Sequence, residues 1–438
     1  MHAALAAATA DRPVPPPPLP GIDTVLDNGL RVVVVRTRVV PLVELRLIVP
    51  CGRLEPHDAA RAELLAATLF HRPDAEEADG ALADVGAELQ AGTDARRLIV
   101  SGFALRDGLP VLLDACADAV LGYRCPPQAL AQERARLAAR LRVAWSHPAA
   151  AARAALQRHR FGEAYAALEI PDPTHLDGTG VEALRALHET AVRPAGSVLV
   201  LAGDLDPDRA LALVTEALGH WPRGGTAART PGPPPVRGGG LRLYDRPGAA
   251  QSQIRLTARA LPRTDPAFPA LQLADLVLGG YFASRLVTSL RERKSYAYGA
   301  RSGIDSAPGS GTLVIETDTS AEHTVAALAE IRRVLRRFVQ EPPSAAEITS
   351  ARRYAIGSTA TAMGAPGSLA MALANLIEVG VGPSWLHEQA RRLHEVTERQ
   401  VGELAVEFYD PAAFTGVVIA DAAASGASPH RLSTPEWC

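Results

Sequence analysis

Short apolar runs, many of them alternating with polar residues, recur along the chain and predict half-buried β-strands. Two of them open each half of the sequence, and one purely apolar run comes near the end of each half. The six predicted strands cover residues 30–35, 43–49, 197–202, 241–244, 253–257 and 415–420. Before the first of them, the dipeptide Asn28-Gly29 is a strong signal for a hairpin turn.

Longer segments rich in Ala, Leu, Arg and Glu predict helices. The main ones cover residues 127–144, 181–192, 321–340 and 397–408. Between the halves, residues 222–240 are so dense in Pro and Gly that they predict a linker, because such a segment builds neither a helix nor a sheet ladder.

The predicted elements follow the same order on both sides of this linker. Each half opens with strands, contains long helices, and closes with a helix, a turn and a strand. We therefore predict an α+β fold with two homologous domains, at residues 22–221 and 241–422, each a mostly antiparallel sheet with helices packed on it. The alternative is a coincidental likeness between two unrelated halves. Residues 1–21, which contain four consecutive prolines, predict a disordered tail, and residues 423–438 a second tail.

Composition excludes several classes of protein. With a net charge of −3 and a pI near 6.5, the chain lacks the basic surface of a nucleic-acid-binding protein. No run approaches 18 apolar residues, so a transmembrane helix is not expected. The N-terminus lacks the cationic start of a signal peptide, and the four cysteines form no Cys-x-x-Cys pair. These features predict a soluble, cytoplasmic protein that has no membrane or nucleic-acid partner.

Three His-Glu dipeptides resemble the start of a zinc-binding His-Glu-x-x-His. They begin at His188, His387 and His394, but the fifth residue of each is not histidine. We therefore expect all three histidines to lie on solvated helix faces. His57 and His71, which flank the helical segment 61–70, are expected at the surface.

Several motifs together carry a resemblance to a known family. They are the opening 26–32, the strand 41–52 followed by Glu55, the segment 84–94, the entry 247–252, and the Gly279-Gly280 … Ser284-Arg285-Leu286 … Arg291 … Tyr298 series. In this order they resemble the pitrilysin/insulinase-like zinc peptidases, in their short two-domain form. The resemblance covers roughly residues 22–422, and it implies that the two domains form half of a clam-like chamber.

The same resemblance implies that the metal site has been lost. Where the family has His-x-x-Glu-His, this chain has Glu63 at the first histidine, Ala66 at the glutamate and Ala67 at the second histidine. The helix that should bring the third ligand has Ala139 and Arg140 at the expected places. Because an alanine can neither bind zinc nor move a proton, we expect the chain to bind no metal or other cofactor, and to be inactive alone.

A second functional feature of the family is retained. Arg291 and Tyr298, seven positions apart, match an Arg/Tyr pair that binds the substrate carbonyl opposite the zinc. A permanent cation and a neutral hydroxyl donor both suit a developing oxyanion. On the residues alone, the pair could equally be a surface arginine and a core tyrosine.

The resemblance therefore implies the non-catalytic subunit of a heterodimeric zinc metallopeptidase. Its partner would carry His-x-x-Glu-His and the zinc, and the substrates would be short peptides, such as the precursor of pyrroloquinoline quinone. Two alternatives stay open: a structural core subunit without a proteolytic role, and a stand-alone peptide-binding homodimer.

Overall fold

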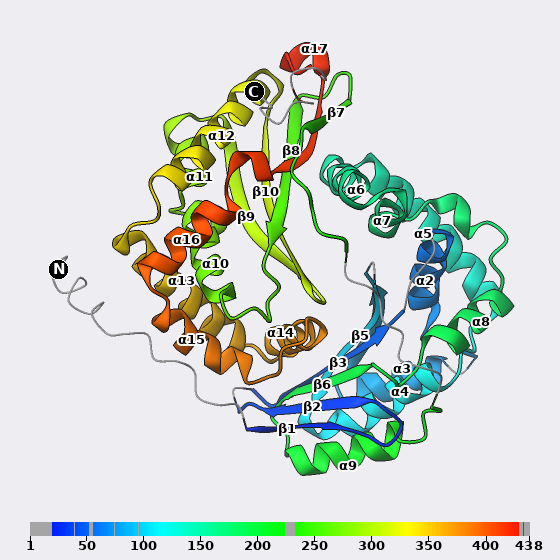
Figure 1. The fold of residues 1–438 in the computed structure, drawn as a ribbon. Coiled ribbons are helices and arrows are strands. Elements are labelled where there is room, and N and C mark those ends of the chain that lie inside the picture. Colours follow the sequence, from blue (N-terminus) through cyan, green and yellow to red (C-terminus); the bar gives the residue numbers. More distant parts are fainter. Residues whose placement is uncertain are drawn as a thin grey trace, which may run out of the picture.

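The computed structural model describes residues 20–38, 40–51, 56–73, 75–94, 96–223, 233–428 and 432. Two β-sheets lie on opposite sides of the molecule, and each carries helices on its outer face (Figure 1). The predicted N-terminal tail falls mostly outside the described residues, as do the middle of the predicted linker, Glu55, and much of the predicted C-terminal tail.

The first half of the chain contains six strands, which form one sheet in the order β1-β2-β6-β3-β5-β4. The strands are β1 (Gly21–Val25), β2 (Arg31–Arg36), β3 (Leu42–Pro50), β4 (Glu88–Thr93), β5 (Arg97–Leu105) and β6 (Val198–Gly203). The helices are α2 (Pro56–Thr68), α3 (Ala75–Asp84), η1 (Arg106–Gly108), α4 (Leu109–Leu121), α5 (Pro127–Ser146), α6 (Pro148–Phe161), α7 (Glu163–Glu169), η2 (Pro173–Leu176), α8 (Val181–Ala191) and α9 (Pro207–Leu218).

The second half contains five strands in the order β7-β11-β8-β10-β9. The strands are β7 (Leu241–Asp245), β8 (Gln251–Ala260), β9 (Ala297–Ala307), β10 (Ser310–Ser320) and β11 (Thr415–Ala420). The helices are α10 (Phe268–Asp275), η3 (Leu276–Gly280), α11 (Arg285–Val287), η4 (Thr288–Arg293), η5 (Ala321–His323), α12 (Thr324–Gln340), α13 (Ala345–Met363), α14 (Pro366–Glu378), α15 (Trp385–Glu395), α16 (Glu398–Phe408), η6 (Pro411–Ala413) and α17 (Ala422–Ser425).

Apart from the extra strand β1, the two sheets have the same strand order. In the first sheet, the last strand, β6, lies parallel to β2 and antiparallel to β3. In the second sheet, the last strand, β11, lies parallel to β7 and antiparallel to β8 in the same way. All six predicted strands and the four predicted helices are present, within a few residues of their expected ends. The predicted α+β class is confirmed. The turn at Asn28-Gly29 joins β1 to β2, with Gly29 at φ 94°, where a side chain would be strained.

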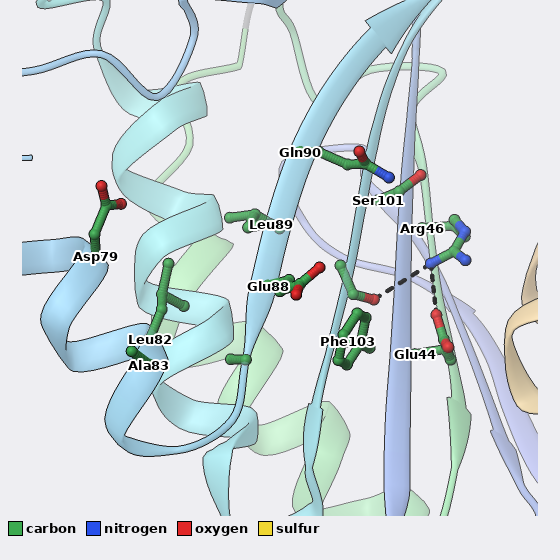
Figure 2. A pocket seen from close by; sticks show the side chains of 12 residues that line it. Glu44, Arg46, Asp79, Leu82, Ala83, Glu88, Leu89, Gln90, Ser101 and Phe103 are labelled. Carbon is green, nitrogen blue, oxygen red and sulfur yellow. Dashed lines mark hydrogen bonds and ion pairs between the residues drawn. The ribbon is translucent and has the colours of Figure 1, made fainter.

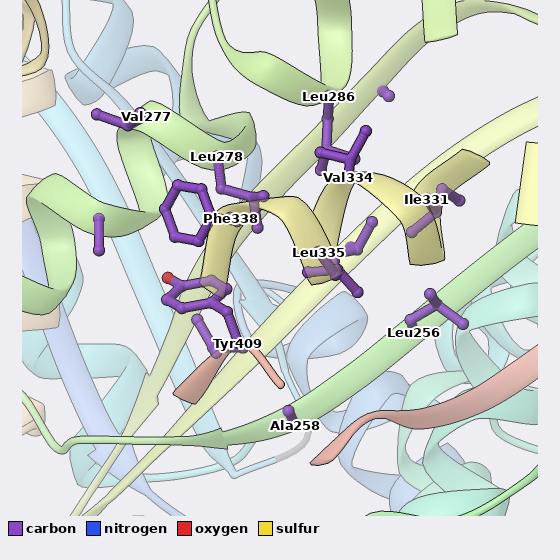
Figure 3. Close-up of a cluster of buried hydrophobic side chains, with 14 of the residues drawn as sticks. Leu256, Ala258, Val277, Leu278, Leu286, Ile331, Val334, Leu335, Phe338 and Tyr409 are labelled. Carbon is purple, nitrogen blue, oxygen red and sulfur yellow. The ribbon is translucent and has the colours of Figure 1, made fainter. Parts of the chain in front are cut away.

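Each half has a hydrophobic core between its sheet and its outer helices. In the second half, α12 presents Ile331, Val334, Leu335 and Phe338 to the sheet at the spacing of one helix face (Figure 3). The Phe338 ring meets Tyr409 edge to face, with 5.1 Å between the ring centroids. Such aromatic pairs add to the free energy gained from burying apolar area.

The two halves also exchange helices: each half packs one helix on the inner sheet face of the other half. Helix α14 of the second half packs Leu369 and Leu373 against Val33, Ile48 and Val200 of the first sheet. Helix α6 of the first half does the converse, packing on β11 of the second sheet. Both helices therefore lie between the two sheets (Figure 1).

Polar contacts reinforce this exchange. Arg97, next to the β4–β5 turn, pairs with Glu378 at the end of α14 at 2.5 Å and donates a hydrogen bond to Asn375 at 3.0 Å. His159 of α6 lies 2.7 Å from the Thr415 hydroxyl at the start of β11. The two halves are thus joined by buried apolar contacts and by side-chain hydrogen bonds.

No single helix in the described ranges is long and apolar enough to cross a membrane. Helices α13 and α14 reach the required length and composition only when taken together, and they are bent by 114° at the break between them.

Candidate functional site

Helix α2 carries the residues expected at the lost metal motif. Leu64, Leu65 and Ala66 are buried in the core of the first half, while Ala67 is only half-buried. Glu63 lies on the helix rim with its side chain 26% exposed. Ala66 and Ala67 offer methyl groups where a base and a metal ligand would be needed.

The helix that should supply the third metal ligand does lie beside α2. The Arg140 guanidinium of α5 is 3.8 Å from the Glu63 carboxylate. Burial raises the pKa of Glu63, and the positive charge of Arg140 offsets part of that rise. Where the resemblance predicts the first and third ligands, the structure therefore contains the Glu63–Arg140 ion pair, and the cation of Arg140 would repel a metal ion.

Among the residues that the structure describes, no three histidine, cysteine, aspartate or glutamate side chains come together as a metal site would require. His71, one of the two histidines flanking α2, is half-exposed and lies 3.8 Å from Glu133. The other, His57, has a side chain outside the described residues.

The prediction that His188 lies on a solvated face is wrong. This side chain is 4% exposed, and its Nε2 lies 3.0 Å from the Ala119 carbonyl oxygen. Burial lowers the pKa of His188, so the neutral ring is favoured inside the core. His387 and His394 are partly buried on α15.

The structure brings Arg291 and Tyr298 together. Arg291 is in the π-helical turn η4, and Tyr298 is the second residue of β9. The Arg291 guanidinium carbon lies 5.5 Å from the centroid of the Tyr298 ring. The Tyr298 side chain is 91% exposed, so the interpretation as a core tyrosine is wrong.

Phe282 completes this group, and sequence reasoning missed it. Its ring is 4.9 Å from the Arg291 guanidinium carbon, although 66% of the residue is exposed. Arg291 thus has cation–π contacts with two exposed rings. The only signal in the sequence was the position of Phe282 inside the Gly-Gly … Ser-Arg-Leu motif.

No carboxylate neutralises Arg291 among the side chains that the structure describes, and its guanidinium donates no hydrogen bond to them. Arg285, in the same half, makes a bidentate pair with Glu347, with its Nε at 2.7 Å. Arg291 is therefore available to an oxygen of a bound molecule.

Tyr298 lines a cleft of about 790 Å³ along β9 and β10. At one end Ser295 has φ 53°, a left-handed conformation that strains a residue with a Cβ atom. Across from Tyr298, the pairing of β10 with β9 shifts between Thr317 and Thr319, which indicates a bulge. Both irregularities flank Tyr298.

The charges inside this cleft neutralise one another. Arg255, with its side chain 7% exposed, pairs with Asp318 at 2.8 Å and lies 3.8 Å from Glu316. Arg301 of β9 also donates to Glu316, at 2.8 Å. Arg255 and Glu316 share a sheet face with Val417, which contacts α6, so the cleft opens on the inner face of the second sheet.

A second cleft, of about 480 Å³, lies beside β4, between α3 and the inner face of the first sheet (Figure 2). Its polar wall contains Arg46, which donates to Glu44 at 2.8 Å. Gly367 in the first turn of α14 lies close by, and a Cβ atom there would be 2.9 Å from the Glu44 carboxylate. Strand β4 ends the first sheet as β9 ends the second.

These features describe a two-sheet α+β protein with an exposed Arg/Tyr pair and with no metal-type cluster among its described residues. Residues 180–354, which include that pair, match the family model of the peptidase M16 inactive domain. The structure resembles the peptidase M16 inactive domain from Pseudomonas fluorescens, with a TM-score of 0.83 and 23% identity over 92% of this chain and 98% of the other. A protease from Helicobacter pylori gives a TM-score of 0.81 at 15% identity, covering 92% of this chain and 100% of the other.

Among curated proteins, an uncharacterized zinc protease of Mycobacterium tuberculosis is 28% identical over 241 residues, which is 53% of this chain and 53% of the relative. One of Mycobacterium leprae is 27% identical over 236 residues, with the same coverage. The match thus spans about half the length of these relatives. The resemblance to the pitrilysin/insulinase-like (M16) peptidases is confirmed: residues 180–354 match the model of the family's inactive domain, and the fold is shared with M16-type structures.

Proposed function

We propose that this chain is the non-catalytic subunit of a heterodimeric zinc metallopeptidase and contributes Arg291 and Tyr298 to the shared active site. The observation that carries the proposal is the state of Arg291, an arginine with two exposed aromatic neighbours and no carboxylate partner within the described chain. A cation left free in this way is prepared to bind the oxygen of a peptide carbonyl.

The chemistry of the two halves supports a division of labour. Hydrolysis by zinc needs the metal on one side of the carbonyl and donors directed at the developing oxyanion. This chain has the donors, and it has Glu63, Ala66 and Ala67 where the metal motif would be. The partner would therefore supply His-x-x-Glu-His, the third ligand and the zinc.

The two clefts support a peptide as the substrate. Each lies on an inner sheet face beside a terminal strand, β4 or β9, whose outer edge has unpaired backbone groups. An extended peptide can pair with such an edge through its main chain. Enclosure between two subunits would favour short, unfolded peptides over folded proteins.

The first test is assembly. Co-expression with a peptidase of similar length that carries His-x-x-Glu-His should give a complex with one copy of each chain, measured by size-exclusion chromatography with mass determination. A stable homodimer that ignores such a partner would contradict the proposal and favour the stand-alone peptide-binding protein.

The second test is kinetic. Arg291→Ala and Tyr298→Phe should each lower kcat/KM of the assembled complex by ~10²–10³-fold, the usual cost of removing one oxyanion donor. Arg291→Lys should restore only part of the rate, because an ammonium lacks the planar fork. The matched control is Arg336→Ala, which removes an exposed arginine of α12.

The affinity between the subunits, measured for each variant, separates catalysis from assembly. Intact assembly with lowered turnover supports the proposal. Unchanged kinetics for both Arg291→Ala and Tyr298→Phe would remove this chain from the active site and leave it as a structural subunit.

A further inference from the structure

The loop between η3 and α11 places two consecutive aromatic residues in different surroundings. Tyr281 stacks on Tyr354 of α13, with 5.4 Å between the ring centroids and 28° between the planes. The next residue, Phe282, lies against Arg291. Few large apolar residues of the second half are as exposed as Phe282, and this exposed ring lies against Arg291.

The loop that carries Phe282 is held on both sides. The amide of Ser284 donates to the Tyr281 carbonyl at 3.1 Å, and Ser284 itself is buried. Before the loop, Gly279 packs so closely on β9 that a Cβ atom would lie 2.6 Å from the Ser302 nitrogen. The Tyr281–Tyr354 stack and these backbone contacts fix the place from which the Phe282 ring extends.

Arginine donates all its hydrogen bonds in the plane of the guanidinium, whereas aromatic rings attract its faces. Contact with the Phe282 and Tyr298 rings therefore leaves the N–H groups free. It also reduces the number of conformations open to a long side chain that has no carboxylate partner among the described residues. Orientation of this kind matters because a displacement of about 1 Å in a catalytic group can cost ~10²-fold in rate.

We infer that Phe282 is a positioning residue for Arg291: its ring orients the guanidinium so that the N–H edge faces the carbonyl of a bound peptide. The inference rests on the proposed function for its effect on turnover. The orientation of Arg291 itself is a property of this chain alone and can be measured without the partner.

The direct test is the Nε–Hε NMR signal of Arg291 in the isolated chain, labelled with ¹⁵N-arginine and assigned by its loss in Arg291→Ala. Protons above an aromatic face are shielded, so Phe282→Leu should move this signal downfield and increase the fast motion that relaxation reports. Phe282→Trp should keep the signal shielded and rigid. Val143→Ala, a truncation of another exposed apolar side chain that is 67% exposed, should leave it unchanged.

The kinetic test uses the assembled complex and its peptide. Phe282→Leu should lower kcat about fivefold with KM changed less than about twofold, and Phe282→Trp or Phe282→Tyr should recover most of the rate. In the Arg291→Ala background, Phe282→Leu should have no further effect, because its role acts through Arg291.

The outcomes separate this inference from the proposed function. An unmoved Arg291 signal in Phe282→Leu, or a loss of rate that persists unchanged in the Arg291→Ala background, overturns the positioning role. If the signal moves but Arg291→Ala leaves turnover intact, the positioning role stands and the oxyanion role falls.

Discussion

Single residues explain why the α2–α5 region no longer suits a metal. Glu63 could in principle act as a ligand, but its carboxylate faces the Arg140 guanidinium. Ala66 and Ala67 cannot bind a metal at all, and Ala66 is packed into the core. In this structure these positions bury apolar surface and balance one charge.

Asp275, at the end of α10, should make stability depend on pH. The carboxyl group is buried, its Oδ1 has no hydrogen-bond partner among the described residues, and burial raises its pKa to about 7 although hydrogen bonding with Ser302 and Tyr409 acts to lower it. An unfolded aspartate has a pKa near 3.9. The folded state therefore binds this proton more tightly, and the stability due to Asp275 is complete below about pH 4 and is lost as the pH rises to about 7.

Asp275→Asn should remove this dependence. As the pH rises from about 4 to about 7, the free energy of unfolding of the variant should increase relative to that of the wild type, by on the order of 2–4 kcal/mol. Urea unfolding midpoints at pH 4.5, 6 and 8 measure the difference, with Asp208→Asn, at an exposed site in α9, as the control. A gain that is the same at all three pH values would show that Asp275 is ionised throughout.

Prediction of single residues from the sequence succeeded where one motif contains both members of a pair. It failed where the neighbour of a residue is brought close only by the fold. The adjacency of Arg291 and Tyr298 followed from the motif that contains them. Phe282 could not be assigned to Arg291, because a cation–π contact depends on the path of the loop. His188 was misplaced because a histidine next to a glutamate has the same local pattern on a buried or a solvated face.

At the scale of elements, the predicted strands and helices agree with the structure because their signals are local. Alternation defines β3, and the turn and cap residues define where α16 begins: Thr397 caps it and accepts from the Gln400 amide. The exchange of α6 and α14 between halves was not predictable. The apolar face of α14 shows that it is buried, but not that its partner is the sheet of the other half.

This exchange predicts an effect that crosses the halves. Leu373 of α14 is fully buried against the first sheet, so Leu373→Ala should cost about 2–5 kcal/mol. The loss should appear as faster hydrogen exchange in β2 and β6, although the substitution lies in the second half.

Leu328→Ala is the control, because Leu328 is equally buried but belongs to the core of the second half alone. It should leave exchange in β2 and β6 unchanged. If Leu373→Ala affects only the helices of its own half, α14 does not hold the first sheet.

At the scale of the whole molecule, the fold resembles that of M16-type structures, and the residues predicted at the metal positions are Glu63, Ala66 and Ala67. The fold includes α2 and α5 side by side, the Arg/Tyr pair on the second half, and two clefts on facing sheets. The sequence comparison put Ala139 and Arg140 at the place of the third ligand, and the structure brings Arg140 to 3.8 Å from Glu63, so α5 lies where a third ligand could reach α2.

Restoring the ligands should therefore restore zinc binding. A variant with Glu63→His, Ala66→Glu, Ala67→His and Arg140→Glu places two imidazoles one helical turn apart on α2, with carboxylates beside them and on α5. Three such ligands and a water satisfy tetrahedral zinc.

After chelation and re-addition of metal, elemental analysis should give one zinc per chain for the variant and none for the wild type. Because Ala66→Glu buries a charge, zinc should also raise the melting temperature of the variant. The same variant without Ala67→His should bind far more weakly. One tightly held zinc in the wild type would overturn the lost site, and no zinc in the full variant would show that α2 and α5 no longer have the spacing of a metal centre.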